Sequence, residues 1–490
     1  MSKKYLTNSQ LIEILRHLPL NELTQLHLFL QSPIFNTNQR ALKLFESIRG
    51  RNKKKFPDFD QLDKEKLFYK AYPERKQYNA GTFKNLVSDL KKLTETYLAF
   101  SEYQKKTHLQ PQFYLEGLLR FRIHDLFQKQ QKNMLPAFEC RVKDPETMLS
   151  EFFAKRTVHH HTTIHAPRNG NTSLQAMSEA LDRFYISTKL KYLLGKYSWE
   201  RMTVINWKTA WLESELLSFL NAPPFGEIPI IHLYHQLVLL IKEDNQTIQF
   251  DAIREYLQTH ETAFSDDESR QAYAVLLNYT RWQVKAGQTG FVQKAFEIYQ
   301  YLLNNKILLV NGFLSPHHFN RIVEYGVQCE ATPFFWTEQF LKGYQCKVDQ
   351  KYLERVMPYN RAMLHFARKE YQKALNYLYK IYQEEEGFFD FYYNLMYRVL
   401  IIKIFFENFK AYKEQLITEV GKFRQYLNYH AEKDIALFEI EANQNFLNTI
   451  EKIIRKKQPL VKIELKELLE EIKNKKQLVE KIWLIEQIRS

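Results

Sequence analysis

The chain has 490 residues, with 70 Lys and Arg against 56 Asp and Glu, which leaves a formal net charge of +14. Its 13 glycines are less than half the usual frequency of roughly 7%, and neither a G-x-x-x-x-G-K-S/T nor a G-x-G-x-x-G segment occurs, which excludes P-loop nucleotide hydrolases and Rossmann dehydrogenases. Three scattered cysteines exclude a disulfide framework, and the apolar runs are far shorter than the roughly 20 residues of a membrane span.

The first 105 residues predict a series of amphipathic helices separated by capping residues and prolines. Apolar residues in the last of them recur at the spacing of one helix face. Because no segment alternates between apolar and polar residues over a useful length, we predict essentially no β-sheet. The predicted N-caps are Asn8 or Ser9, Asn21, Asn36 or Asn38, Asp63 and Asn79.

Residues 109–156 continue the helical pattern, with breaks predicted at Pro136 and Pro145. The next stretch, residues 157–173, reads TVHHHTTIHAPRNGNTS and has little apolar content. We interpret it as a linker, or as a long loop within one superhelix. Adjacent histidines on a loop lack the fixed geometry of a zinc site, so the sequence favours a solvated polar loop over a specific metal site. These histidines are His159, His160, His161 and His165.

Beyond residue 265 the sequence contains a repeat. Three segments begin with an apolar residue followed by asparagine, and they are separated by 42 and 40 residues: Leu277-Asn278, Phe319-Asn320 and Tyr359-Asn360. A second apolar helix follows each segment after a short break. A helix–turn–helix unit that recurs at about 40 residues is typical of an α-solenoid.

One of these units, residues 361–381, resembles a tetratricopeptide repeat. Ala362, Tyr371 and Ala374 match the small, aromatic and small positions of that pattern. Arg361, Ile381 and Glu386 depart from it. The resemblance implies a tetratricopeptide-like superhelix over about residues 265–450. The chain is also similar to a widespread group of all-helical proteins from Bacteroidota, from which no functional residue carries over. The similar segments are Ser32–Asn36, Asp182–Leu190, Asn278–Gly287 and Ala362–Leu375.

Basic residues are concentrated in one predicted interhelix loop. Five positive charges fall within seven residues, at Arg49, Arg51, Lys53, Lys54 and Lys55. Such a loop can follow a phosphate backbone or attract an acidic protein partner. The alternative is a solvated loop that prevents aggregation.

Aromatic residues are concentrated near residue 390. Phe388, Phe389, Tyr392 and Tyr393 lie within six residues. Aromatic side chains bury a large area at low entropic cost, so they are candidates for a peptide-binding groove. The alternative is that they pack one helical pair of the solenoid against the next.

The C-terminal residues 451–490 predict two strongly amphipathic helices that are separated near Asn474. A solenoid needs a polar-faced element at its end, so we interpret them as a cap. The alternative is a helix pair that binds a partner or a second copy of the chain.

Cys329 and Cys346 lie in apolar repeat segments and are interpreted as core residues.

The sequence therefore predicts an all-α protein with a helical N-terminal domain (1–156), a linker or long loop (157–173), a helical-repeat domain (174–450) and a C-terminal helical cap (451–490). The basic N-terminus has no apolar segment of the kind found in secretory signals, so we expect a cytoplasmic protein. We expect a non-enzymatic scaffold for protein–protein interactions, without cofactor or metal. The alternative is an RNA- or DNA-associated helical-repeat protein that uses its basic loops.

Overall fold

A computed structural model of the chain divides into two compact units. The N-terminal unit comprises Met1–Ala137 with Phe153–Ser173, and the C-terminal unit comprises Phe138–Phe152 with Leu174–Ser490. The structure describes residues 5–6, 9–50, 59–60, 62–139, 144–165, 172–202, 207–208, 211–220, 227–242, 247–310, 312–331, 333–382, 391–431, 437–456, 462–475 and 477–489.

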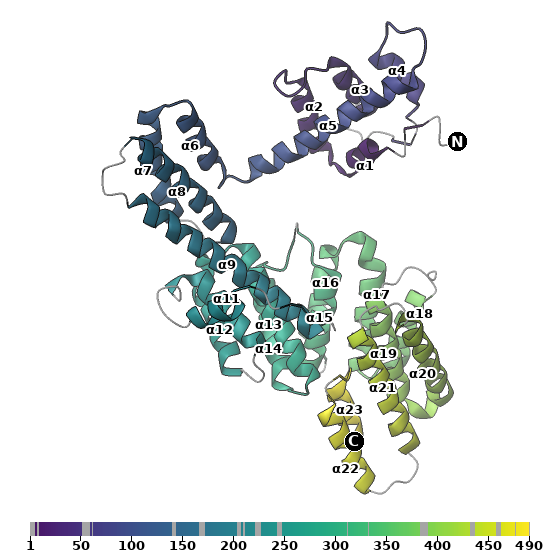
Figure 1. The fold of residues 1–490 in the computed structure, drawn as a ribbon. Coiled ribbons are helices and arrows are strands. Elements are labelled where there is room, and N and C mark those ends of the chain that lie inside the picture. The colour runs from purple at the N-terminus through teal and green to yellow at the C-terminus, as the bar shows by residue number, and fades with distance from the viewer. Residues whose placement is uncertain are drawn as a thin grey trace. The chain divides into compact units, whose positions relative to one another are not determined.

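Helices form nearly all of the described secondary structure (Figure 1). The first eight are α1 (Gln10–His17), α2 (Leu20–Gln31), α3 (Gln39–Arg49), α4 (Lys64–Ala71), α5 (Ala80–Lys105), α6 (Gln110–Arg120), α7 (His124–Glu139) and α8 (Pro145–His165). The next seven are α9 (Ser173–Met202), α10 (Glu213–Phe219), α11 (Pro229–Lys242), α12 (Thr247–Thr259), α13 (Asp266–Lys285), α14 (Gly290–Asn304) and α15 (Pro316–Cys329). The last eight are α16 (Phe335–Tyr344), α17 (Gln350–Ala367), α18 (Tyr371–Tyr382), α19 (Phe391–Glu407), α20 (Phe409–Ala431), α21 (Leu437–Lys456), α22 (Lys462–Asn474) and α23 (Lys481–Arg489).

The all-α prediction is confirmed for the described ranges. Instead of a sheet, they contain two isolated β-bridges, between Tyr5 and Asp63 and between Val310 and Phe313. None of the helices in these ranges combines the length and the apolar character needed to cross a bilayer.

Four of the five predicted capping positions in the first 105 residues are confirmed. Ser9, Asn38, Asp63 and Asn79 each accept a hydrogen bond from a backbone N–H in the first turn of the following helix. The prediction for Asn21 is wrong by two residues, because α2 begins at Leu20 directly after Pro19. Helices α1, α2 and α3 pack along α5, and α4 packs on α3. Together they bury an apolar cluster that runs from Leu6 to Tyr97.

Neither Pro136 nor the first half of the predicted linker interrupts a helix. Pro136 lies inside α7, and α8 continues through residues 157–165, for which the sequence predicts a linker or long loop. The physical reason is that α8 has a buried face without aliphatic periodicity: Thr157, Val158 and His161 are buried, and His161 stacks on Phe127 of α7. Residues 166–171 of the predicted linker lie outside the described residues.

Many consecutive helices of the C-terminal unit pack against each other. The closest pairs are α13 with α14, α17 with α18, and α19 with α20 (Figure 1). The first helices of successive pairs also contact one another, because α15 packs on α17 and α17 packs on α19. Short connections between helices favour this arrangement of sequence neighbours.

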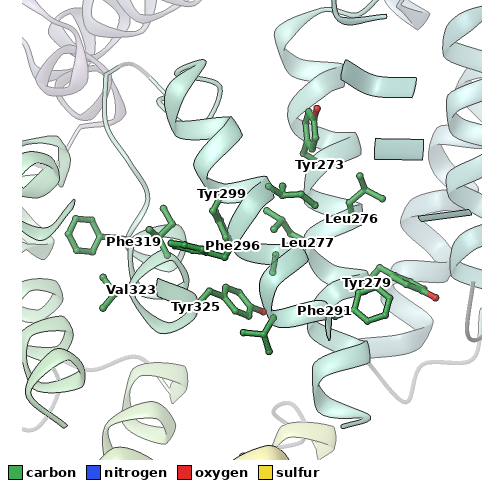
Figure 2. Packing of buried hydrophobic residues seen from close by; sticks show 14 of the residues in the cluster. Tyr273, Leu276, Leu277, Tyr279, Phe291, Phe296, Tyr299, Phe319, Val323 and Tyr325 are labelled. Atoms are coloured by element: carbon green, nitrogen blue, oxygen red, sulfur yellow. The ribbon is translucent and has the colours of Figure 1, made fainter. Parts of the chain in front are cut away.

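Aromatic residues fill the space between the helices of this unit. Tyr279 of α13 and Phe291 of α14 meet edge to face, with ring centroids 5.8 Å apart (Figure 2). Phe296, Tyr299, Phe319 and Tyr325 continue the same buried cluster toward α15. Each buried aromatic ring removes a large apolar area from water, so the high content of tyrosine and phenylalanine is largely accounted for by packing.

A buried polar row crosses three of the first helices at the predicted repeat. The Nδ2 of Asn360 in α17 donates to Oδ1 of Asn320 in α15 at 2.6 Å, and Nδ2 of Asn320 donates to the hydroxyl of Tyr393 in α19 at 3.0 Å. In α13, Asn278 is only half-buried, while Thr280, 40 residues before Asn320, is buried. The 40-residue spacing of Asn320 and Asn360 therefore coincides with a side-chain hydrogen bond between α15 and α17.

The two predicted C-terminal helices are present as α22 and α23. Lys481 of α23 is buried, and its Nζ donates to the carbonyl oxygens of Ala286 at 3.2 Å, Lys473 at 2.6 Å and Lys475 at 3.2 Å. Burial lowers the pKa of Lys481. This side chain ties the last helix to the C-terminal end of α13, so part of the predicted cap packs against an early helix of the unit.

Candidate functional site

An apolar pocket of about 440 Å³ lies between α13, the segment that joins α14 to α15, and the start of α17. Its floor consists of aliphatic side chains from the core of the C-terminal unit, including Leu277, Leu302 and Leu314. Pockets of a few hundred Å³ with mostly apolar walls are typical binding sites for small ligands or for single side chains of a partner.

The rim is a tight turn between α14 and α15. Val310 and Phe313 exchange two backbone hydrogen bonds, of 2.9 and 3.0 Å, and Gly312 has a φ of 83°, which favours glycine. The backbone N–H of Leu314 donates to the carbonyl of Lys347 at 2.7 Å and fixes the turn to the segment before α17. The side chains of Val310 and Phe313 are 56% and 50% exposed. Two large apolar side chains are thus held at the mouth of an apolar pocket.

Polar side chains at the pocket have structural partners. Ser315 caps α15 by accepting from the N–H of His318 at 3.2 Å, and Asp349 caps α17 by accepting from the N–H of Lys351 at 3.1 Å. Arg270 forms an ion pair with Asp267. Burial lowers the pKa of His318, which keeps its imidazole neutral near pH 7. The chemistry that this pocket offers is apolar burial with a few polar groups at its edge.

Five charged side chains meet where α13, α15 and α21 come together. Glu439 of α21 accepts from Arg281 at 3.2 Å and from Lys285 at 3.1 Å. On α15, Arg321 donates to Glu324 at 2.5 Å. Three cations therefore share two carboxylates in a half-buried cluster.

The crowding of these cations shifts their pKa values. Arg321 and burial lower the pKa of Arg281, and burial together with Arg281 lowers the pKa of Lys285 to about 8. Burial by itself raises the pKa of Glu439, but Lys285 and Arg281 outweigh it and bring it below its ordinary value. The cluster is held by mutual attraction across helices that are distant in sequence.

The predicted basic loop is placed only in part. Arg49 is 5% exposed, and its Nη2 donates to Oγ1 of Thr24 at 2.6 Å inside the N-terminal unit. In this conformation its guanidinium is covered and does not reach a surface partner. Arg51, Lys53, Lys54 and Lys55 lie outside the described residues.

The predicted aromatic group is also divided. Tyr393 is half-buried and joins the polar row through Asn320, whereas Tyr392 is 53% exposed. Phe388 and Phe389 lie outside the described residues. For Tyr393 the placement agrees with the packing alternative.

The histidine run has a structural contact. His159 contacts the hydroxyl of Ser173 at 2.9 Å, and no cluster of His, Cys, Asp or Glu suited to a metal is found among the described residues.

The two cysteines of the repeat segments differ in burial. Cys329 packs against the core and burial raises its pKa to about 11. The core prediction for Cys346 is wrong, because this side chain is exposed in the short turn after α16.

Comparisons with protein-family models, with curated protein sequences and with solved structures found no match. The chain's own geometry is therefore the basis for a functional proposal.

Sequence reasoning missed the apolar pocket. Its walls come from residues 270 to 352, and its rim has no pattern that distinguishes it from an ordinary interhelix loop. The available signal was the segment Ile307-Leu308-Leu309-Val310, an apolar run placed between two helices instead of inside one.

Proposed function

We propose that the protein is a non-enzymatic, cytoplasmic scaffold for protein–protein interactions. The observation that carries this proposal is the open apolar pocket beside α13, with the exposed side chains of Val310 and Phe313 at its mouth. Exposed apolar groups around a cavity are typical of interaction sites, because a partner that covers them removes apolar area from water.

The arrangement of the C-terminal unit supports a solenoid of the tetratricopeptide-like kind as the scaffold. Paired helices follow one another, and first helices contact first helices. Ala362 and Ala374, which match the small positions of the pattern, are both fully buried in the α17–α18 pair. Small residues at these positions let two helices approach closely.

The partner that this pocket fits is a peptide segment with one large apolar side chain. A volume of about 440 Å³ accommodates a leucine, methionine or phenylalanine side chain with space for its neighbours. The net charge of +14 favours acidic residues beside that anchor, because the field of the whole protein attracts negative chains.

The test is affinity capture with the full chain and three single variants. Val310→Asp and Phe313→Asp each place a charge at the rim of the pocket. Ile417→Asp is the matched control, because Ile417 is 55% exposed on α20 of the same unit and does not line the pocket. Each variant is tagged, captured from its native cells with and without nuclease, and its bound proteins are quantified by mass spectrometry.

We expect a stoichiometric protein partner that survives nuclease and is lost, by about tenfold or more, with both rim variants. The same partner should remain with Ile417→Asp. Equal retention in the rim variants and the control would refute the pocket as the docking site. Loss of all bound proteins after nuclease would instead favour the nucleic-acid alternative.

A further inference from the structure

A second cavity, of about 880 Å³, lies within the N-terminal unit. It is bounded by the end of α6, by the turn that joins α6 to α7, and by one face of α8. Its charged lining consists of Arg120, Arg122 and Arg156 with the single carboxylate of Glu116. The cavity is therefore strongly basic.

Helix geometry explains how α8 contributes one wall. Arg156, His160 and Ile164 are spaced by four residues, so they lie on one face of the helix and all three line the cavity. His161 points elsewhere, since it is buried against Phe127. The histidine run thus divides between a cavity wall and the packing between helices.

The opposite wall depends on an unusual backbone. Arg122 has a φ of 61°, a left-handed conformation that few residues other than glycine adopt. It lies in the turn between α6 and α7, whereas Arg120 lies on the last turn of α6. The turn brings both arginines to the same cavity as Arg156.

These three arginines differ from most others in the described part of the chain. In the C-terminal unit Arg254, Arg368 and Arg398 each form an ion pair with a glutamate. Within the described residues no ion pair is found for Arg120, Arg122 or Arg156. The guanidinium groups of Arg120 and Arg156 lie over the rings of Phe121 and Phe153, at 5.5 and 4.7 Å from the ring centroids.

We propose that this cavity binds an oligophosphate, either as the phosphate chain of a nucleotide or as a free polyphosphate. Guanidinium groups bind phosphate oxygens through paired N–H donors, and three of them match a ligand with several phosphates. The volume exceeds that of a phosphate chain and lies in the range of nucleotide-sized pockets. Leu119 and Ile164 supply apolar walls for the organic part.

This mode of binding does not need a glycine-rich loop. P-loops hold phosphates mainly through backbone N–H groups, whereas here side chains from two helices and a turn supply the donors. The scarcity of glycine therefore does not exclude the proposal. It concerns binding alone and is independent of the proposed scaffold function.

The test is calorimetric titration of the full chain with tripolyphosphate, ATP and adenosine. The variant is Arg122→Gln with Arg156→Gln, which removes two charges from the cavity. The matched control is Arg75→Gln with Lys76→Gln, which removes two charges from exposed residues elsewhere in the same unit. Far-ultraviolet circular dichroism checks that both variants keep the helical fold.

We expect tripolyphosphate and ATP to bind with one-to-one stoichiometry, and adenosine to show no saturable binding. The cavity variant should bind tripolyphosphate and ATP at least tenfold more weakly. The control should change affinity less than twofold. Tighter binding of ATP than of tripolyphosphate would indicate a nucleotide whose organic part contacts the apolar wall. Equal affinities would indicate that the ligand is free polyphosphate. Absence of saturable phosphate binding, or equal weakening by the control, would overturn the proposal.

Discussion

Lys285 shows how the surroundings of one side chain create a pH dependence. Its Nζ lies 3.1 Å from Glu439, but burial and the neighbouring Arg281 outweigh this attraction and lower its pKa to about 8. In the unfolded chain a lysine has a pKa of roughly 10.4. Between these two values the unfolded chain binds a proton that the folded chain does not, so stability rises with pH.

We therefore expect the free energy of unfolding of the native chain, relative to a Lys285→Met variant, to increase by about 1–3 kcal/mol between pH 7 and pH 9.5. Urea unfolding at several pH values measures this difference. Lys410→Met is the control, because Lys410 is an exposed lysine of α20 and its removal changes the charge equally. If the free energy of unfolding of the native chain relative to Lys285→Met stays constant or falls with pH, the lowered pKa of Lys285 is contradicted.

At the scale of single residues, capping was the most predictable feature. Ser9, Asn38, Asp63 and Asn79 were predictable because a short polar side chain satisfies backbone N–H groups only a few residues away. The covered state of Arg49 was not, because it depends on Thr24, a residue on another helix.

Two neighbouring helices approach closely at a position where glycine leaves room for a side chain of the other helix. Gly326 of α15 is such a position: a Cβ added there would lie 2.5 Å from Oγ1 of Thr337 on α16. That hydroxyl donates to Glu330 at 2.9 Å, so it is not free to move away without losing a hydrogen bond. The two helices are thus set at a distance that only glycine permits.

We expect Gly326→Ala to destabilise the C-terminal unit by about 1–3 kcal/mol, because the added methyl group forces the helices apart. Gly343→Ala in α16 is the control, since nothing lies within 4 Å of its added Cβ. Alanine there should be neutral or stabilise the helix by about 0.5–1 kcal/mol. The midpoint of urea unfolding is measured for each variant. Similar midpoints for both variants would argue against the close contact at Gly326.

At the scale of elements, long periodic helices were predictable and unconventional ones were not. The helical part of 157–173 was missed because its buried face uses threonine and histidine, which carry no apolar periodicity. Two of the three asparagines of the predicted repeat, Asn320 and Asn360, share a buried hydrogen bond, whereas Asn278 is only half-buried. Both cavities were beyond prediction, since each depends on how separate helices pack.

Two large apolar clusters are separate from each other within the described residues. One covers residues from Leu6 to Tyr97, and the other covers residues from Met148 to Leu484. All six tryptophans lie in the C-terminal unit: Trp199, Trp207, Trp211, Trp282, Trp336 and Trp483. Tryptophan fluorescence therefore reports on that unit, whereas circular dichroism reports on both.

We expect the urea midpoints from fluorescence and from circular dichroism to differ, because separate cores unfold separately. Leu90→Ala in α5 removes a fully buried side chain and should cost the N-terminal unit about 2–5 kcal/mol. It should move the circular dichroism transition and leave the fluorescence transition in place. Leu427→Ala in α20, equally buried, should move both. A fluorescence shift with Leu90→Ala would show one cooperative unit.

The contact between Lys481 and the carbonyl of Ala286 also sets a timing. The two residues are 195 positions apart, so a ribosome that adds about 5–20 residues per second needs roughly 10–40 s to travel from one to the other. During that interval the end of α13 is not yet covered by α23. Chaperones or proteases therefore have access to the helix face that α23 later covers. A helix that is synthesised much later therefore completes the packing of α13.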